Sequence, residues 1–306
     1  MDLLNGFLTV GLVVAVGALL AHLGIVTLTT QRELGNFAFL VASPALMLTT
    51  IAETEIGSAL WTNLTASVAS FVVAAGAYAA YAFWRYRRAL GDLVVGGLAS
   101  AYVNAGNLGI PIAGYVLGDA AAVAPTLLLQ MLVLQPLALL VLESRVPGRR
   151  TGLRTVLTLP LRAPITVGSL LGLVLATTGW SLPPAVHDPI ELLGNMAIPA
   201  MLVSYGIALR LGPGLAAAGV RDELAVTTVS KLVLQPLVAY LVAHWLLGMD
   251  GAALVAIVVM AALPTAQNIF MHAQRYGRSE ALVRDTILVT TLLSVPTIVL
   301  VVLLLG

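Results

Sequence analysis

The chain has 306 residues, of which 59% are apolar and 9% are charged, and its mean hydropathy is +1.01. Soluble domains carry about 25% charged residues, so these side chains cannot cover a soluble surface. Intrinsic disorder is excluded because disordered chains are poor in apolar residues. Cysteine is absent, which excludes disulfides, zinc–thiolate sites and thiol nucleophiles. The composition therefore indicates a polytopic membrane protein.

Long apolar runs predict ten membrane-spanning helices, because a helix needs roughly 20 mostly apolar residues to cross a bilayer. Short breaks that contain Arg, Asp, Glu, Gly or Pro separate these runs. Alternating segments of about ten residues, which would indicate a β-barrel, are not seen. In chain order the predicted spans are 6–28, 35–52, 58–84, 93–116, 121–142, 163–180, 190–209, 222–247, 252–273 and 282–305.

The placement of charge predicts the orientation of these spans. All arginines lie in or beside the loops that follow spans 1, 3, 5, 7 and 9. The opposite side has no Lys or Arg, so the positive-inside rule places the arginine loops in the cytoplasm and both termini outside, in a plasma or inner membrane. The first span is not expected to be a signal peptide, because no basic residue precedes it. The arginines are Arg32, Arg85, Arg87, Arg88, Arg145, Arg149, Arg150, Arg154, Arg162, Arg210, Arg221, Arg275, Arg278 and Arg284. The acidic residues of the opposite side are Asp2, Glu53, Glu55, Asp119, Asp188, Glu191 and Asp250.

The longest loop divides the chain into two halves of five spans, 1–142 and 162–306, joined by a cytoplasmic linker at 143–161. An odd number of spans per half gives the halves opposite orientations, which is typical of the inverted repeats of secondary transporters. An offset of 160 aligns the residue pairs Asn104–Pro264, Asn107–Gln267, Thr126–Thr286 and Pro136–Pro296. Spans 2 and 7 share a further signature, at 34–38 and 193–197. Chance matching of common residues is the alternative. The recurrence of 132–136 at 232–236 is attributed to chance, because spans 5 and 8 are not repeat partners.

Two predicted spans carry residues that break helices. Span 4 contains two asparagines, two glycines and a proline within 104–111, and span 9 contains a proline and two amides within 264–268. Proline removes a backbone donor, and irregular backbone at membrane depth is tolerated only inside protein or beside a water-filled cavity. Kinked helices with buried amides are the alternative. The substrate-binding residues predicted at the breaks are Asn104, Gly106, Asn107, Gly109, Pro111, Pro264, Thr265, Gln267 and Asn268.

The expected ligand of such breaks is a small anion. The second half of a broken helix begins with free N–H groups and a partial positive charge, and this suits a carboxylate. Amides can bind it without a buried fixed charge. Two further residues join the prediction: Gln130 on span 5, and Lys231, the only lysine, ten residues into span 8. Lys231 could attract the anion, replace the sodium ion of a coupled carrier, or extend to the cytoplasmic interface.

The motifs resemble a known family. The Asn-x-Gly-Asn-x-Gly-x-Pro segment from Asn104 to Pro111 is similar to the signature of the auxin efflux carriers, the PIN-like carriers, which have many bacterial members. The segment 264–268, followed by Tyr276 and Gly277, is similar to their second signature. The resemblance covers the whole chain and implies a fold like the bile-acid sodium symporters, with spans 4 and 9 crossing. It also implies a scaffold of spans 1, 2, 6 and 7, a moving unit of spans 3–5 and 8–10, and a homodimer through the scaffold.

The function expected from the sequence is elevator-type secondary transport of a mono- or dicarboxylate, auxin-like or malonate- or malate-like. An anion channel, or a sodium-coupled symporter of a bile-acid-like or other organic acid, is the alternative. An enzyme is not expected, because no cluster of Asp and His, and no Ser/His/Asp set near an interface, is seen. No catalytic residue, metal, cofactor or nucleic acid is predicted. The expected partners are the organic anion and the lipid bilayer.

Overall fold

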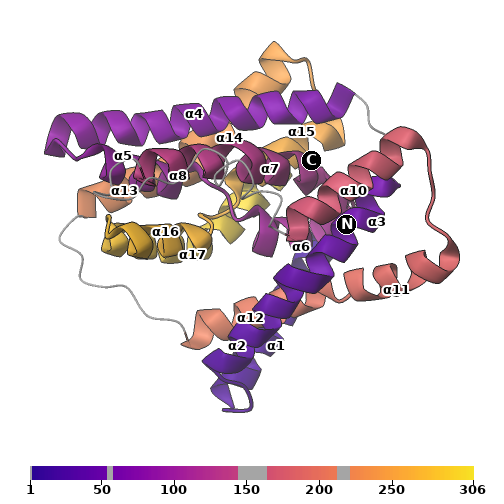
Figure 1. Cartoon of the computed structure of the whole chain (residues 1–306). Helices are drawn as coiled ribbons and strands as arrows, with labels where there is room; N and C mark the ends of the chain where they lie inside the picture. The colour runs from indigo at the N-terminus through magenta and orange to yellow at the C-terminus, as the bar shows by residue number, and fades with distance from the viewer. Residues whose placement is uncertain (1, 54–57, 144–163, 212–220) are drawn as a thin grey trace. The chain divides into compact units, whose positions relative to one another are not determined.

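The computed structural model describes residues 2–53, 58–143, 164–211 and 221–306, and every regular element within these ranges is a helix (Figure 1). Almost all of the predicted linker at 143–161 lies outside the described residues, as do the arginines from 145 to 162 and Glu55. Six helical segments are long and apolar enough to cross a membrane. They are Leu28–Ala52, Trp61–Tyr86, Ala120–Leu142, Pro184–Leu211, Arg221–Leu246 and Glu280–Leu305.

The other four predicted spans contain shorter apolar helices. Spans 1 and 6 correspond to α1 (Asp2–His22) and α10 (Pro164–Thr178). Span 4 is divided into α5 (Leu90–Ala101) and a helical stretch from Ala105 to Leu117, and span 9 into α15 (Gly251–Ala262) and α16 (Asn268–Tyr276). The non-helical segments lie at 102–104 and 263–267, and they contain Asn104 and Pro264. The break of span 4 was predicted over 104–111, but from Ala105 onward these residues, Pro111 included, lie in helical turns.

Three predicted boundaries were wrong by six or seven residues. The helix of span 1 ends at His22 rather than 28. The helix of span 2 begins at Leu28 rather than 35, because the Thr27 side chain accepts a bond from the Thr30 backbone N–H and caps the first turn. The polar residues 30–33 therefore lie inside the helix. The helix of span 7 begins at Pro184 rather than 190, since proline is well tolerated in the first turn.

Four π-helical turns each end two residues before a proline. They are Ala38–Ala42 before Pro44, Ala105–Gly109 before Pro111, Gln130–Leu134 before Pro136, and Ser230–Leu234 before Pro236. Proline lacks an N–H and its ring clashes with the carbonyl four residues earlier, and a wider turn accommodates both defects. The last two turns belong to the recurrence of 132–136 at 232–236, so that recurrence has a shared local structure.

The helices form two compact units. The first unit comprises Met1–Ser58, Ala105–Leu128 and Thr158–Pro213. Within it α1 packs along α12 (Ala197–Leu211), and α10 packs along α3 (Ser43–Ala52). Glycine permits the close approach of α1 and α12, because a Cβ atom on Gly206 would lie 2.0 Å from the Val14 carbonyl oxygen. The unit also contains α2 (Leu28–Phe37), α6 (Ile110–Ile112), α7 (Ala124–Leu129) and α11 (Pro184–Gly194).

The second unit comprises Ala59–Asn104, Leu129–Leu157 and Gly214–Gly306. Its longest helices are α4 (Ser58–Tyr86) and α17 (Glu280–Leu305), and it contains α5, α15 and α16. Its other helices are α8 (Gln135–Glu143), α13 (Arg221–Val229) and α14 (Gln235–Tyr240). One buried cluster joins Val95 and Leu98 of α5 to Ile269 of α16, so the core of this unit lies directly beside both helix breaks.

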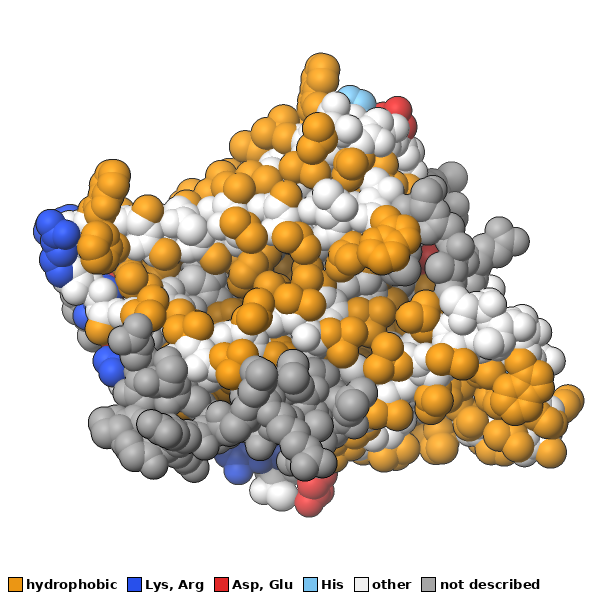
Figure 2. Space-filling view, turned by 45° about the horizontal axis from the view of Figure 1, so that its top comes forward, with side chains coloured by type: hydrophobic (Ala, Val, Ile, Leu, Met, Phe, Trp, Pro, Cys, Tyr) orange, Lys and Arg blue, Asp and Glu red, His pale blue; other side chains and the backbone are white. Residues whose placement is uncertain are grey.

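Large apolar side chains are widely exposed on both units. Trp61, Trp84 and Leu303 are among them, and hydrophobic side chains cover much of the face in Figure 2. Large exposed apolar surfaces are rare on soluble monomers. Together with the six long apolar helices, this surface identifies a multi-pass integral membrane protein.

Candidate functional site: the paired helix breaks

The breaks in spans 4 and 9 pair with each other inside the second unit. Val103 and Thr265 form an antiparallel bridge. The Asn104 backbone N–H donates to the Pro264 carbonyl at 2.8 Å, and the Ala266 N–H donates to the Tyr102 carbonyl at 3.0 Å. The pairing joins Asn104 to Pro264, the two residues that an offset of 160 aligns in the sequence. Proline has no N–H, so Pro264 cannot return a bond to Asn104.

Side chains from three other segments satisfy the carbonyls at and after the end of α5. Thr265 Oγ1 donates to the Ala99 carbonyl at 2.5 Å. Gln235 Nε2 donates to the Ala101 carbonyl at 2.8 Å, and Gln130 Nε2 to the Val103 carbonyl at 3.0 Å. The last carbonyls of a helix lack partners within that helix, and lipid offers no water to replace them. These bonds allow α5 to end in the buried interior of the unit.

Lys231 forms a hydrogen bond with a backbone carbonyl at the end of α15. Its side chain is 0% exposed, and Nζ donates to the Ala261 carbonyl at 2.9 Å and to Gln235 Oε1 at 2.7 Å. Since Gln235 also binds Ala101, the lysine is linked to the C-terminal ends of both first-half helices, where the helix dipole favours a cation. The lysine therefore does not extend to the cytoplasmic interface, and that alternative was wrong.

A series of threonines supports the break in span 9. The Thr265 N–H donates to Thr290 Oγ1 at 3.1 Å, and Thr290 Oγ1 donates to the Thr286 carbonyl at 2.7 Å. Thr286 Oγ1 in turn lies 2.8 Å from Thr227 Oγ1. Sequence reasoning missed Thr290. The repeat alignment could have identified it, because an offset of 160 aligns Thr290 with Gln130. Each of these two side chains forms a hydrogen bond with the backbone of a break.

Tyr102 and Gln135 form another contact that was missed. The Tyr102 hydroxyl donates to Gln135 Oε1 at 3.3 Å. Gln135 and Gln235 are the same residue of the recurring segments 132–136 and 232–236, and both bind the end of span 4's first half. The recurrence that was attributed to chance thus marks two glutamines beside the end of α5, of which Gln235 donates to a backbone carbonyl and Gln135 accepts from a side-chain hydroxyl.

The predicted site residues fall into two groups by burial. Gly106, Asn107, Gln267 and Asn268 are partly exposed. The others are buried, and they are Asn104, Gly109, Pro111, Gln130, Lys231, Pro264 and Thr265. The structure brings Asn104, Gln130, Lys231, Pro264 and Thr265 together through the bonds given above.

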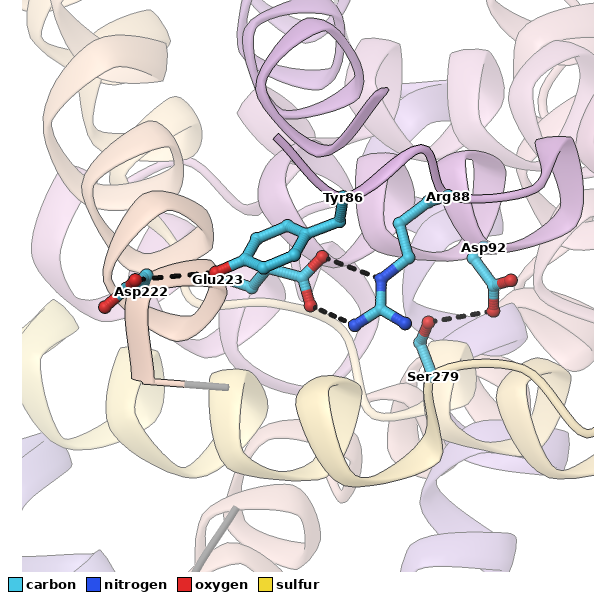
Figure 3. A network of polar contacts seen from close by, with 6 residues as sticks. All are labelled: Tyr86, Arg88, Asp92, Asp222, Glu223 and Ser279. Atoms are coloured by element: carbon cyan, nitrogen blue, oxygen red, sulfur yellow. Dashed lines mark hydrogen bonds and ion pairs between the residues drawn. The ribbon is translucent and has the colours of Figure 1, made fainter. Parts of the chain in front are cut away.

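A second polar network lies where α4, α5, α13 and the link before α17 meet (Figure 3). Arg88 Nε and one terminal nitrogen bind the two carboxylate oxygens of Glu223 at 3.0 and 2.8 Å. These bonds raise the pKa of the Arg88 guanidinium above its ordinary value, so it stays charged. Ser279 Oγ donates to Asp92 at 3.0 Å, and the Tyr86 hydroxyl to Asp222 at 3.4 Å. Sequence reasoning did not single out Glu223.

The apolar helices and their paired polar breaks define a helical membrane protein whose irregular backbone lies in its core. The chain belongs to the membrane transport protein family, whose model matches residues 4–302. The resemblance to the auxin efflux carriers is confirmed, and the chain is a transporter, not an enzyme.

Two relatives support this assignment. The "Putative malonate transporter" of Rhizobium meliloti (strain 1021) is 28% identical over 272 residues, which cover 87% of this chain and 84% of the relative. The "Auxin efflux carrier component 3a" of Oryza sativa subsp. japonica is 29% identical over 150 residues, which cover 48% of this chain and 24% of that protein.

Proposed function

We propose that the protein is a secondary carrier of a small organic anion, a mono- or dicarboxylate, that works by elevator-type alternating access. The pairing of the two helix breaks carries this proposal, because discontinuous helices that meet in the core are typical of the substrate sites of secondary transporters. The name of the Rhizobium relative supports malonate as the first compound to test.

The proposal includes ten spans arranged as two inverted repeats of five. The pairing of Asn104 with Pro264 supports it, as do the aligned positions of Gln130 and Thr290, each of which binds the backbone of a break. In the first unit, α1 packs on α12 and α10 packs on α3, so span 1 contacts span 7 and span 6 contacts span 2. In a repeat of two halves, span 6 is the counterpart of span 1 and span 7 the counterpart of span 2, so the two contacts are counterparts of each other. Both termini are proposed to face the outside of a plasma or inner membrane, and spans 1, 2, 6 and 7 to form the scaffold and the contact of a homodimer.

The proposed anion contacts are the partly exposed residues of the breaks. Gln267 and Asn268 lie at the start of α16, where the helix dipole provides a partial positive charge. Gly106 and Asn107, which belong to the first unit, are proposed as anion contacts on the sequence motif alone. The buried residues hold the backbone in this conformation. Loss of one amide bond to the anion should weaken binding by roughly 1–3 kcal/mol.

Lys231 is proposed to replace a coupling cation. A sodium ion bound between the C-terminal ends of α5 and α15 would be coordinated by backbone carbonyls, and Nζ and Gln235 already occupy Ala261 and Ala101. Transport should therefore proceed without sodium. A sodium requirement in the wild-type protein would contradict this role, as would a normal affinity and rate in Lys231→Ala with no new need for sodium.

A ligand screen tests the substrate class. The purified protein should be stabilised against heat by one or more compounds in a series of mono- and dicarboxylates, equally with and without sodium. Asn268→Ala and Gln267→Ala should each lose most of the shift. Asn195→Ala is the matched control, because Asn195 is an exposed asparagine at the end of α11. Equal shifts in all variants would refute the proposed contacts.

A further inference from the structure

Buried charge is confined to a few side chains. Among the described residues, three charged side chains are buried: Glu223 and Asp285 at 1% exposure and Lys231 at 0%. All three belong to the second unit. An ionised group in an apolar interior is costly unless an opposite charge or several hydrogen bonds compensate it, so the partner of each charge determines the net buried charge.

Both buried carboxylates have an arginine partner. Glu223 receives two parallel bonds from Arg88, as Figure 3 shows. Asp285 Oδ1 receives two bonds from Arg284, at 3.1 and 3.0 Å. Each arginine side chain is about one-third exposed, at 36% and 31%. Each pair is neutral overall, so neither contributes net charge to the interior.

Lys231 differs because its partners are neutral. Nζ binds an amide oxygen and a backbone carbonyl, and within the described parts of the chain it forms no ion pair. The C-terminal helix ends favour a cation at this position but supply only partial charge. With Nζ protonated, the unit that contains the paired breaks would carry one buried positive charge without a full counter-charge.

We propose that Lys231 stays protonated, held by its two acceptors and the C-terminal ends of α5 and α15, and that it sets the charge of the transported species. The anion carried is singly charged: a monocarboxylate, or a dicarboxylate that retains one proton. With the anion bound, the buried charges sum to zero, so the loaded unit crosses the membrane without responding to voltage. The empty unit carries one positive charge, and its return is the voltage-sensitive step. This inference rests on the proposed carrier function.

The expected effect of voltage is large. One elementary charge that crosses the full field gains an energy set by the membrane potential. At 100 mV this shifts the balance between the two positions of the empty unit by up to about fifty-fold. The loaded unit, with its charges balanced, should show no shift. Without Lys231 the loaded unit should respond to voltage and the empty unit should not, because the bound anion alone would carry charge through the field.

Exchange and net flux separate these two steps. Proteoliposomes with the full chain would be loaded with monomethyl malonate, whose single charge is fixed, and the potential would be set with potassium and valinomycin. Exchange needs only the loaded unit, and its rate should be the same at 0 and 100 mV of either sign. Net efflux needs the return of the empty unit and should change severalfold. Exchange that responds to voltage together with net flux that does not would overturn the inference.

Two variants and a second compound complete the test. Lys231→Gln should make exchange voltage-sensitive, and Lys231→Arg, which keeps the charge, should not. If neither variant is stable, the pH dependence of malonate uptake by the wild-type protein tests the inference instead. Malonate uptake at fixed total concentration should fall as pH rises and removes the second proton, while uptake of monomethyl malonate stays constant. Malonate uptake that holds or rises with pH would contradict the inference. No carboxylate flux under any condition would instead refute the carrier function itself, and the charge assignment with it.

Discussion

Replacement of Arg88 by Gln should destabilise the second unit through the carboxylate that it leaves behind. Glu223 is 1% exposed, and the substitution removes the two bonds, 3.0 and 2.8 Å long, that compensate its charge. Removal of one partner from a fully buried ion pair costs about 3–5 kcal/mol. Because the Arg88 side chain is 36% exposed, water can reach the site after the substitution, and we expect about 2–3 kcal/mol.

The double variant Arg88→Gln with Glu223→Gln separates charge from packing. It leaves two amides that can bond each other and no buried charge, so most of the lost stability should return, with a remaining cost of about 1 kcal/mol. Thermal unfolding in detergent measures the order: the single variant lowest, the double variant between, and the wild type highest. Arg85→Gln is the control, because Arg85 is exposed and lies over the Tyr86 ring. A double variant no more stable than the single variant would refute this reasoning.

Two further substitutions test the break and the packing of the first unit. Gln130→Leu should cost about 1–3 kcal/mol, because it leaves the buried Val103 carbonyl without its side-chain donor. An unchanged melting temperature would contradict the support assigned to this amide. Gly206→Ala should destabilise the fold strongly, since the new Cβ would lie 2.0 Å from the Val14 carbonyl oxygen. Gly76→Ala, where nothing lies within 4 Å of the new atom, should be neutral or slightly stabilising, and equal losses in the two alanine variants would refute the close-packing explanation.

The helix breaks could be predicted because their residues are conspicuous. Proline and asparagine interrupt apolar runs around Asn104 and Pro264, and each of these residues disfavours a continuous helix for a known reason. The family could be recognised from the same segments. The repeat alignment, which rested on a few shared residues, also placed in register the two residues whose backbones bond.

The direction of the side chains could not be predicted. Lys231 was noticed as an unusual charge, but its partner at Ala261 is a backbone carbonyl, and no residue type in the sequence marks a carbonyl that needs a donor. Thr290 was missed for a similar reason, because hydroxyls in membrane helices usually bond within their own helix. Glu223 was overlooked because a carboxylate at a span end is expected to be solvated. Its burial depends on Arg88, a residue 135 positions away.

The most direct test of the central claim is counterflow in proteoliposomes that contain the wild-type protein. Vesicles loaded with unlabelled malonate and diluted into a trace of labelled malonate should accumulate label transiently above equilibrium, saturably and without sodium. Asn268→Ala should lower the affinity roughly 5- to 150-fold, the equivalent of about 1–3 kcal/mol. Failure to accumulate malonate or any other small carboxylate would contradict the account, and so would wild-type counterflow in both Asn268→Ala and Asn107→Ala.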